Sequence, residues 1–121
     1  VVHGQGMDEI SLIGTTRIFE LRDGKITSFE LNPADYGIAS ASIDALGSGD
    51  AIANAGVIRE ILAGKERGPK RDIVVLNAAA GIIVAGLADG FAQALGLAET
   101  SIEEGKALYC LERLIELSNR P

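Results

Sequence analysis

Residues 15–31 read TTRIFELRDGKITSFEL, and this stretch decides how the fold begins. On both sides of Asp23-Gly24, alternate side chains fall on opposite faces with the period of two that a β-strand shows. Asp-Gly between two such runs favours a tight turn, because both central residues of that turn take positive φ angles. The stretch therefore predicts a β-hairpin that turns at Asp23-Gly24.

The segments on either side of the hairpin are less regular. Residues 1–13 (VVHGQGMDEISLI) hold two short apolar stretches separated by glycines and an acidic pair. This pattern predicts a strand, a turn and a second short extended piece. After the hairpin, Asn32 and Pro33 predict a turn or a single helical turn, and residues 42–46 predict at most one more.

Helices are predicted over most of the remaining chain. The first has apolar residues at spacings of three and four, with Ser48 or Asp50 as its N-cap and Gly64 as its stop. A second covers residues 73–88 (IVVLNAAAGIIVAGLA), although three β-branched residues at its start leave a strand open as an alternative. It is shorter than the roughly 20 apolar residues that a membrane span needs. The last two are predicted over about 91–104 and over 105–118.

These patterns together predict an α/β fold, with a short strand and a β-hairpin followed by about four helices. We divide the chain into residues 1–31, with the strands and the acidic pair, residues 32–48, with a loop and short turns, and a helical part over residues 49–121. A sheet this small cannot bury both of its faces, so we expect some strands to pair with sequence outside this chain. The start at Val1, without a methionine, also predicts a piece of a longer protein.

Composition excludes several classes of function. The 121 residues contain 11 Lys and Arg against 17 Asp and Glu, and the net charge of −6 disfavours a nucleic-acid-binding surface. Cys110 is the only cysteine, which excludes a disulfide framework and a cysteine-based zinc site. A reducing, cytoplasmic setting is therefore expected, with no membrane partner.

The acidic pair Asp8-Glu9 is the first candidate for chemistry. Consecutive residues of an extended backbone point to opposite sides, so the two carboxylates would serve two different cations more naturally than one. Magnesium accepts such ligands when substrate phosphates and water complete its octahedron. From the residues alone, an ordinary solvated turn pair is the favoured interpretation.

The other polar candidates have structural interpretations. We expect His3 to be a hydrogen-bonded structural histidine, Cys110 to act as a small hydrophobic residue, and residues 47–50 (GSGD) to cap a helix. The last group also resembles a phosphate cradle, but only weakly, because Asp50 would repel a phosphate at that helix start. Asn77 lies inside an apolar run, so it must find partners, and we expect it to lock helix packing. A solvated basic loop is predicted for Lys65, Arg67, Lys70 and Arg71.

Several motifs in a fixed order carry a family resemblance. His3-Gly4, residues 6–12 (GMDEISL), Gly14 and Thr16-Arg17 resemble a central motif of the anthranilate phosphoribosyltransferases. The resemblance continues through residues 49–51 (GDA), 54–55 (NA), 68–69 (GP), 71–80 (RDIVVLNAAA), 105–108 (GKAL) and 111–112 (LE), so that it spans essentially the whole chain.

The resemblance implies transfer of the 5-phosphoribosyl group from phosphoribosyl pyrophosphate to the amino nitrogen of anthranilate, in tryptophan biosynthesis. It also implies that Asp8 and Glu9 bind Mg²⁺ attached to the phosphoribosyl substrate, and that the whole enzyme is a homodimer. No catalytic residue of the family is assigned within this chain.

Members of that family are much longer, so the chain resembles only the C-terminal part of a larger α/β phosphoribosyltransferase catalytic domain. The family's Gly-Thr-Gly-Gly-Asp phosphate loop and its Lys-His-Gly-Asn segment are absent from this sequence. We therefore expect the chain to be inactive by itself. Two alternatives stay open: a non-catalytic, self-associating fragment, and a piece of a related nucleoside phosphorylase-like or nucleic-acid-binding protein.

Overall fold

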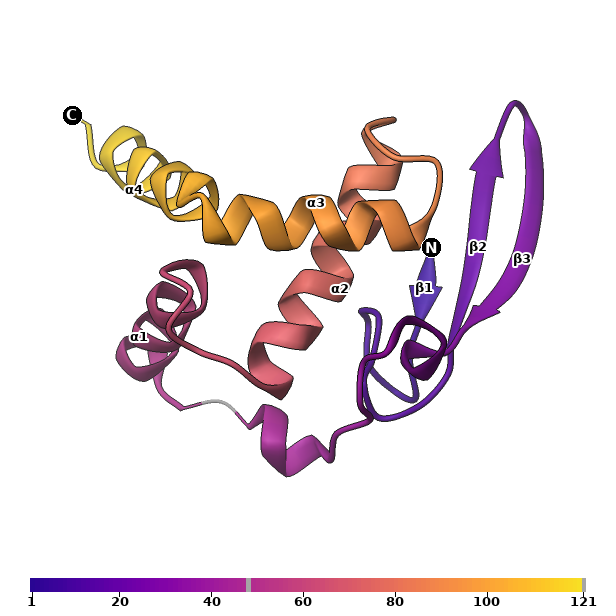
Figure 1. The fold of residues 1–121 in the computed structure, drawn as a ribbon, viewed down its shortest axis with the longest axis horizontal. Coiled ribbons are helices and arrows are strands. Elements are labelled where there is room, and N and C mark those ends of the chain that lie inside the picture. Colours follow the sequence, from indigo (N-terminus) through magenta and orange to yellow (C-terminus); the bar gives the residue numbers. More distant parts are fainter. Residues whose placement is uncertain (48, 121) are drawn as a thin grey trace.

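The computed structural model describes residues 1–47 and 49–120, and Figure 1 shows a small sheet beside a group of helices. The strands are β1 (Val2–His3), β2 (Thr16–Arg22) and β3 (Lys25–Leu31), and two 3-10 turns follow, η1 (Pro33–Tyr36) and η2 (Ile43–Leu46). The helices are α1 (Ala51–Leu62), α2 (Pro69–Val84), α3 (Phe91–Glu103) and α4 (Lys106–Ser118). Across the described ranges, this order confirms the predicted α/β fold of a short strand and a hairpin followed by four helices.

The hairpin forms at the predicted place. Strands β2 and β3 pair antiparallel over their full lengths, up to Arg22 opposite Lys25, which leaves Asp23 and Gly24 as the loop. The two loop residues have φ angles of 50° and 73°, the positive values that a type I′ turn requires. Strand β1 pairs with the other edge of β2, so the strand order is β1-β2-β3.

The prediction for residues 1–13 is only partly right. Strand β1 has two residues, and Gly4 and Met7 then form an isolated bridge. Gln5 and Gly6 turn the chain with positive φ angles of 52° and 88°. The expected second piece forms no strand, because residues 8–13 join no ladder, and the backbone N–H groups of Ile10 and Ser11 bind side chains instead.

Helix α1 begins and ends as its sequence signals indicate. The Asp50 side chain accepts a hydrogen bond from the Ala53 backbone N–H at 2.8 Å, which satisfies a free donor of the first turn. Gly64 follows the helix with a φ of 71°, as expected for a helix stop. The alternative cap, Ser48, lies outside the described residues.

Helix α2 differs from its prediction at both ends. It begins at Pro69, whose fixed φ suits a first helical position, and it ends at Val84 instead of Ala88, because Gly86 turns the chain with a φ of 72°. The strand alternative for residues 73–75 is wrong. Helices α3 and α4 agree with their predicted ranges to within one residue. No helix in the described ranges is long and apolar enough to cross a membrane.

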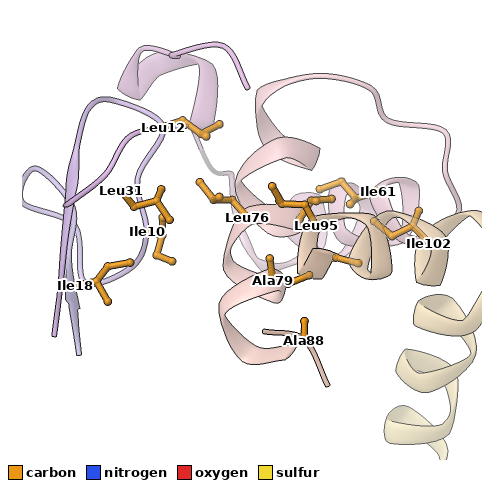
Figure 2. Packing of buried hydrophobic residues seen from close by; sticks show 13 residues of the cluster. Ile10, Leu12, Ile18, Leu31, Ile61, Leu76, Ala79, Ala88, Leu95 and Ile102 are labelled. Atoms are coloured by element: carbon orange, nitrogen blue, oxygen red, sulfur yellow. The ribbon is translucent and has the colours of Figure 1, made fainter. Parts of the chain in front are cut away.

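The core lies between the sheet and helices α2 and α3, and α3 crosses α2 on the way to α4 (Figure 1). Figure 2 shows the side chains from the strand side facing those of the helices. Ile10 and Leu12 are 1% and 0% exposed, so the loop that carries the acidic pair is itself part of this core. The labelled core residues are Ile10, Leu12, Ile18, Leu31, Ile61, Leu76, Ala79, Ala88, Leu95 and Ile102.

The β2–β3 hairpin extends beyond the helices (Figure 1). Apolar side chains on the hairpin and at the end of α2 are exposed. Ile26 on β3 is 72% exposed, and Val84 at the end of α2 is 90% exposed. Val84 also lines an apolar groove, together with Val2, Phe19, Phe29, Ile83 and Phe91, among others. The sheet therefore leaves part of its apolar area uncovered within this chain.

The turn assignment predicts opposite effects for two glycine substitutions. Gly24→Ala should lower the free energy of unfolding by about 1–2 kcal/mol, because alanine is disfavoured at a positive φ. Gly56→Ala, inside α1 with open space around the added methyl group, should raise it by about 0.5–1 kcal/mol. Urea unfolding of the two variants measures both changes, and a Gly24→Ala variant at least as stable as the wild type would contradict the turn assignment.

Candidate functional site

The loop over residues 4–14 connects β1 to β2 and begins with a tight turn. The backbone N–H of Gly4 donates to Met7 O at 3.1 Å, and the N–H of Met7 donates to Gly4 O at 2.9 Å. A Cβ atom on Gly4 would lie 2.6 Å from Glu9 O and 2.7 Å from the Cβ of Ser11. Only glycine fits there, so the turn lies directly against the segment with the acidic pair.

Asp8 and Glu9 lie on the exposed edge of this loop. Both residues are exposed, whereas Ile10, Ser11 and Leu12 directly after them are buried. The two carboxylates are therefore open to a ligand, while the backbone that follows them is held in the core.

The Asn77 side chain, on α2, binds this buried segment. Its Oδ1 accepts from the Ile10 backbone N–H at 2.9 Å, and its Nδ2 donates to Ile10 O at 2.8 Å and to Ile73 O at 3.0 Å. The prediction that Asn77 must find partners is confirmed. Its partner outside α2 is a loop 67 residues away in the sequence, a contact that the sequence analysis did not identify.

Thr16 and Ser11 hold the next part of the loop. The Ser11 backbone N–H donates to Thr16 Oγ1 at 3.0 Å, and the Ser11 hydroxyl accepts from the Ile13 N–H at 3.0 Å. Ser11 and Thr16 are fully buried. Side chains thus satisfy the backbone N–H groups of Ile10, Ser11 and Ile13, and the Ala41 backbone N–H donates to Leu12 O at 3.1 Å, so that partners outside a strand ladder satisfy this segment.

The donor set on the exposed edge suits a hard cation with other ligands of its own. Carboxylate oxygens are ligands that magnesium prefers, but Asp8 and Glu9 supply only part of an octahedron. No group of three or more His, Cys, Asp or Glu side chains is placed to hold a metal ion among the described residues. The two carboxylates could supply part of the coordination shell of such a cation, and they do not form an all-protein cage.

Two other candidates differ from expectation. His3 is exposed in β1, and its side chain forms none of the hydrogen bonds found in the described ranges, so the expected structural hydrogen bond is not observed. Cys110 is exposed, so its prediction as a packed hydrophobic residue is wrong. The half-buried side of α4 carries Leu108 and Leu111, and Cys110 lies outside that stripe.

The predicted basic loop is also partly wrong. Lys70 and Arg71 belong to the first turn of α2, and Arg71 is only 7% exposed. The guanidinium of Arg71 lies 3.4 Å from a carboxylate oxygen of Glu99 on α3 and 3.9 Å from one of Asp72. Arg71 therefore connects α2 to α3 through an ion pair. A charged side chain can be buried in this way only when the fold places carboxylates beside it.

Asp72 has a perturbed carboxyl group. Its partial burial raises the pKa above the ordinary aspartate value, the Arg71 guanidinium opposes this rise, and the charge of Glu99 adds to it. The folded state therefore binds a proton at Asp72 more readily than the unfolded chain does.

A family model described as "Glycosyl transferase family, a/b domain" matches residues 1–108. The chain belongs to this family. The resemblance noted in the sequence is confirmed by curated relatives. The anthranilate phosphoribosyltransferase of Agrobacterium fabrum is 46% identical over 119 residues, which are 98% of this chain and 34% of that protein.

Solved structures agree with the sequence matches. Anthranilate phosphoribosyltransferase from Thermus thermophilus superposes with a TM-score of 0.83 at 36% identity, covering 93% of this chain and 33% of that chain. The Saccharomyces cerevisiae enzyme in complex with PRPP and Mg gives a TM-score of 0.86 at 28% identity, covering 95% and 33%. The chain therefore spans about a third of the length of these relatives.

Asp72→Asn should stabilise the chain at neutral pH. Because the folded pKa of Asp72 lies above the unfolded one, its ionisation costs stability as the pH rises through the folded pKa. The gain from the amide should be absent below the unfolded aspartate pKa of about 3.9 and present above the folded one. Urea unfolding across this pH range measures the difference in stability between the variant and the wild type. A variant less stable than the wild type at pH 7 would contradict the raised pKa of Asp72.

Proposed function

We propose that this chain is the C-terminal third of an enzyme that transfers the 5-phosphoribosyl group from phosphoribosyl pyrophosphate to the amino nitrogen of anthranilate, with release of pyrophosphate. The observation that carries the proposal is the family match over residues 1–108 together with relatives and solved structures named anthranilate phosphoribosyltransferase. The full-length enzyme contains this sequence as its C-terminal third.

Within this proposal, Asp8 and Glu9 hold the Mg²⁺ that accompanies the phosphoribosyl substrate. The support is their exposure, their hard oxygen donors and the rigid backbone that follows them. When bound, magnesium would neutralise the negative charge that develops on the leaving pyrophosphate.

The remaining parts of the proposal follow from the same assignment. The anthranilate-binding residues and the phosphate loop belong to the other two thirds of the enzyme. The surface through which the enzyme forms a homodimer also belongs there. The single cysteine supports a cytoplasmic enzyme. The net charge of −6 weighs against the alternative of a nucleic-acid-binding relative, and the acidic pair weighs against a phosphorylase.

Asp8→Asn combined with Glu9→Gln, made in the full-length enzyme, should lower the magnesium-dependent kcat/KM by roughly 1,000-fold or more. The reason is that metal stabilisation of the departing charge is worth several kcal/mol. Because both side chains are exposed, the free energy of unfolding should change by no more than about 0.5 kcal/mol. Steady-state kinetics with anthranilate and phosphoribosyl pyrophosphate, together with urea unfolding, measure the two effects.

A second adjacent acidic pair provides the matched control. Glu103→Gln with Glu104→Gln, at the end of α3 and also exposed, removes the same number of charges away from the loop and should leave the kinetics unchanged. Unchanged kinetics in the Asp8 and Glu9 variant, or an equal loss in the control, would remove the site assignment.

A second candidate role is favoured by the exposed apolar surface of the hairpin. Leu21 and Ile26 are cross-strand partners on β2 and β3, and both are largely exposed on one face. Contiguous apolar area of this kind promotes association. The 121-residue chain by itself is then a non-catalytic, self-associating fragment.

The isolated chain should sediment as species heavier than one chain at tens of micromolar, and it should consume no anthranilate with phosphoribosyl pyrophosphate and magnesium. Leu21→Lys with Ile26→Lys should shift the sedimentation toward the single chain, because charged residues on exposed strands oppose pairing. A strictly monomeric wild-type chain would contradict the association, and measurable turnover would contradict the expected inactivity.

A further inference from the structure

One side chain satisfies both backbone polar groups of the residue that follows the acidic pair. The Ile10 N–H donates to Asn77 Oδ1 at 2.9 Å, and Ile10 O accepts from Asn77 Nδ2 at 2.8 Å. The Asn77 carboxamide therefore acts on Ile10 as a neighbouring strand would, and it does so one residue after Glu9.

We propose that Asn77 is the positioning residue of the acidic loop. By fixing the backbone at Ile10, its carboxamide determines where the Asp8 and Glu9 carboxylates lie when the metal-bearing substrate arrives. The inference rests on the proposed function, because it assigns Asn77 a part in binding that substrate without contact to it.

Asn77 is itself held firmly. Its Nδ2 also donates to Ile73 O, one turn earlier in α2, which fixes the orientation of the carboxamide. On the same helix, Leu76 and Ala79 are fully buried in the core between the sheet and the helices. Figure 2 shows Leu76 on the side of α2 toward Leu12 and Ile10. The rigidity of a packed helix is thus transmitted to a loop that has no strand partner.

The contact requires a carboxamide. An acceptor and a donor must lie side by side on one planar group, and aspartate offers only acceptors when it is ionised. Leucine has a similar volume but neither kind of atom, so it would leave the buried N–H and C=O of Ile10 without partners. Asn77→Leu and Asn77→Asp therefore separate the hydrogen bonds from the volume of the side chain.

The experiment uses the full-length enzyme and two measurements. Amide hydrogen exchange at Ile10 reports the loop, and the EPR signal of free Mn²⁺ in the presence of phosphoribosyl pyrophosphate reports the affinity of the site. In Asn77→Leu, the Ile10 amide should exchange at least ~10-fold faster, while the amide of Leu95 in the α3 core should be unchanged. The dissociation constant of Mn²⁺ should rise about 10-fold or more, the usual loss when a group that orients metal ligands is removed.

Asn77→Asp is the second variant, for the case that leucine prevents folding. It keeps an acceptor for the Ile10 N–H but places a second acceptor against Ile10 O. Positioning predicts weaker Mn²⁺ binding. Added negative charge acting only through electrostatics would instead strengthen cation binding, so the direction of the change distinguishes the two.

Asn54 provides a matched control elsewhere in the fold. Its Oδ1 accepts from the Gly49 N–H at 2.8 Å and its Nδ2 donates to Gly49 O at 3.1 Å, which is the same two-bond contact at the start of α1. Asn54→Leu should speed exchange at Gly49 and leave Mn²⁺ affinity unchanged. If the loss of such a contact weakened Mn²⁺ binding only by disturbing the structure, Asn54→Leu and Asn77→Leu would lower the Mn²⁺ affinity equally.

The outcomes separate the inference from the function on which it rests. If Asp8→Asn/Glu9→Gln loses Mn²⁺ affinity while Asn77→Leu keeps normal affinity, the positioning role is overturned and the proposed function stays intact. The same holds if Asp8→Asn/Glu9→Gln loses affinity and the Ile10 amide exchange is unchanged in Asn77→Leu. Normal affinity in Asp8→Asn/Glu9→Gln overturns the assignment of these two carboxylates to the metal, and the positioning role fails with it. Loss of affinity in both variants, with the Asn54 control unaffected, supports the inference.

Discussion

The two hydrogen bonds between the Asn77 carboxamide and the backbone of Ile10 are the contact on which the rest of this structure depends. The chain from β1 to β2 passes through the core without joining the sheet, so its polar groups need partners from elsewhere. Asn77 supplies them at Ile10, and Thr16 supplies one at Ser11. With those groups satisfied, Ile10 and Leu12 can pack beside Leu76, and the sheet side of the core is joined to α2 (Figure 2).

This arrangement divides the loop into a buried half and an exposed half. The buried half gives the loop a fixed course, while Asp8 and Glu9 face outward with too few donors to hold a metal ion alone. In our proposal, the missing ligands come from a phosphorylated substrate that arrives with the cation. This incomplete donor set also agrees with a chain that covers about a third of its relatives' length, where the other ligands belong to the remaining two thirds in our proposal.

Features that depend on residues close together in the sequence could be predicted. Features that depend on contacts between residues far apart in the sequence could not. The hairpin depends on Asp23-Gly24 and on alternation within a few residues, and the cap of α1 depends on Asp50 three residues before Ala53. Both predictions are confirmed. Asn77 was recognisable as a polar residue in need of partners, but its partner lies 67 residues away and is a backbone, which has no sequence signal. Arg71 resembled a surface charge because Glu99, its partner on α3, is also remote. The metal assignment of Asp8 and Glu9 depends on family resemblance, since an exposed acidic pair alone has no specific pattern.

The most direct test is to determine where the metal ion binds. In the full-length enzyme with isotopically labelled amides, Mn²⁺ and phosphoribosyl pyrophosphate are added together, and paramagnetic broadening is measured at each amide of this third of the chain. The account predicts that the amides of Asp8 and Glu9 broaden most, and that they do so far more strongly with the substrate than with Mn²⁺ alone. Broadening centred on other residues of this chain, or none at the acidic loop in the presence of the substrate, would contradict it.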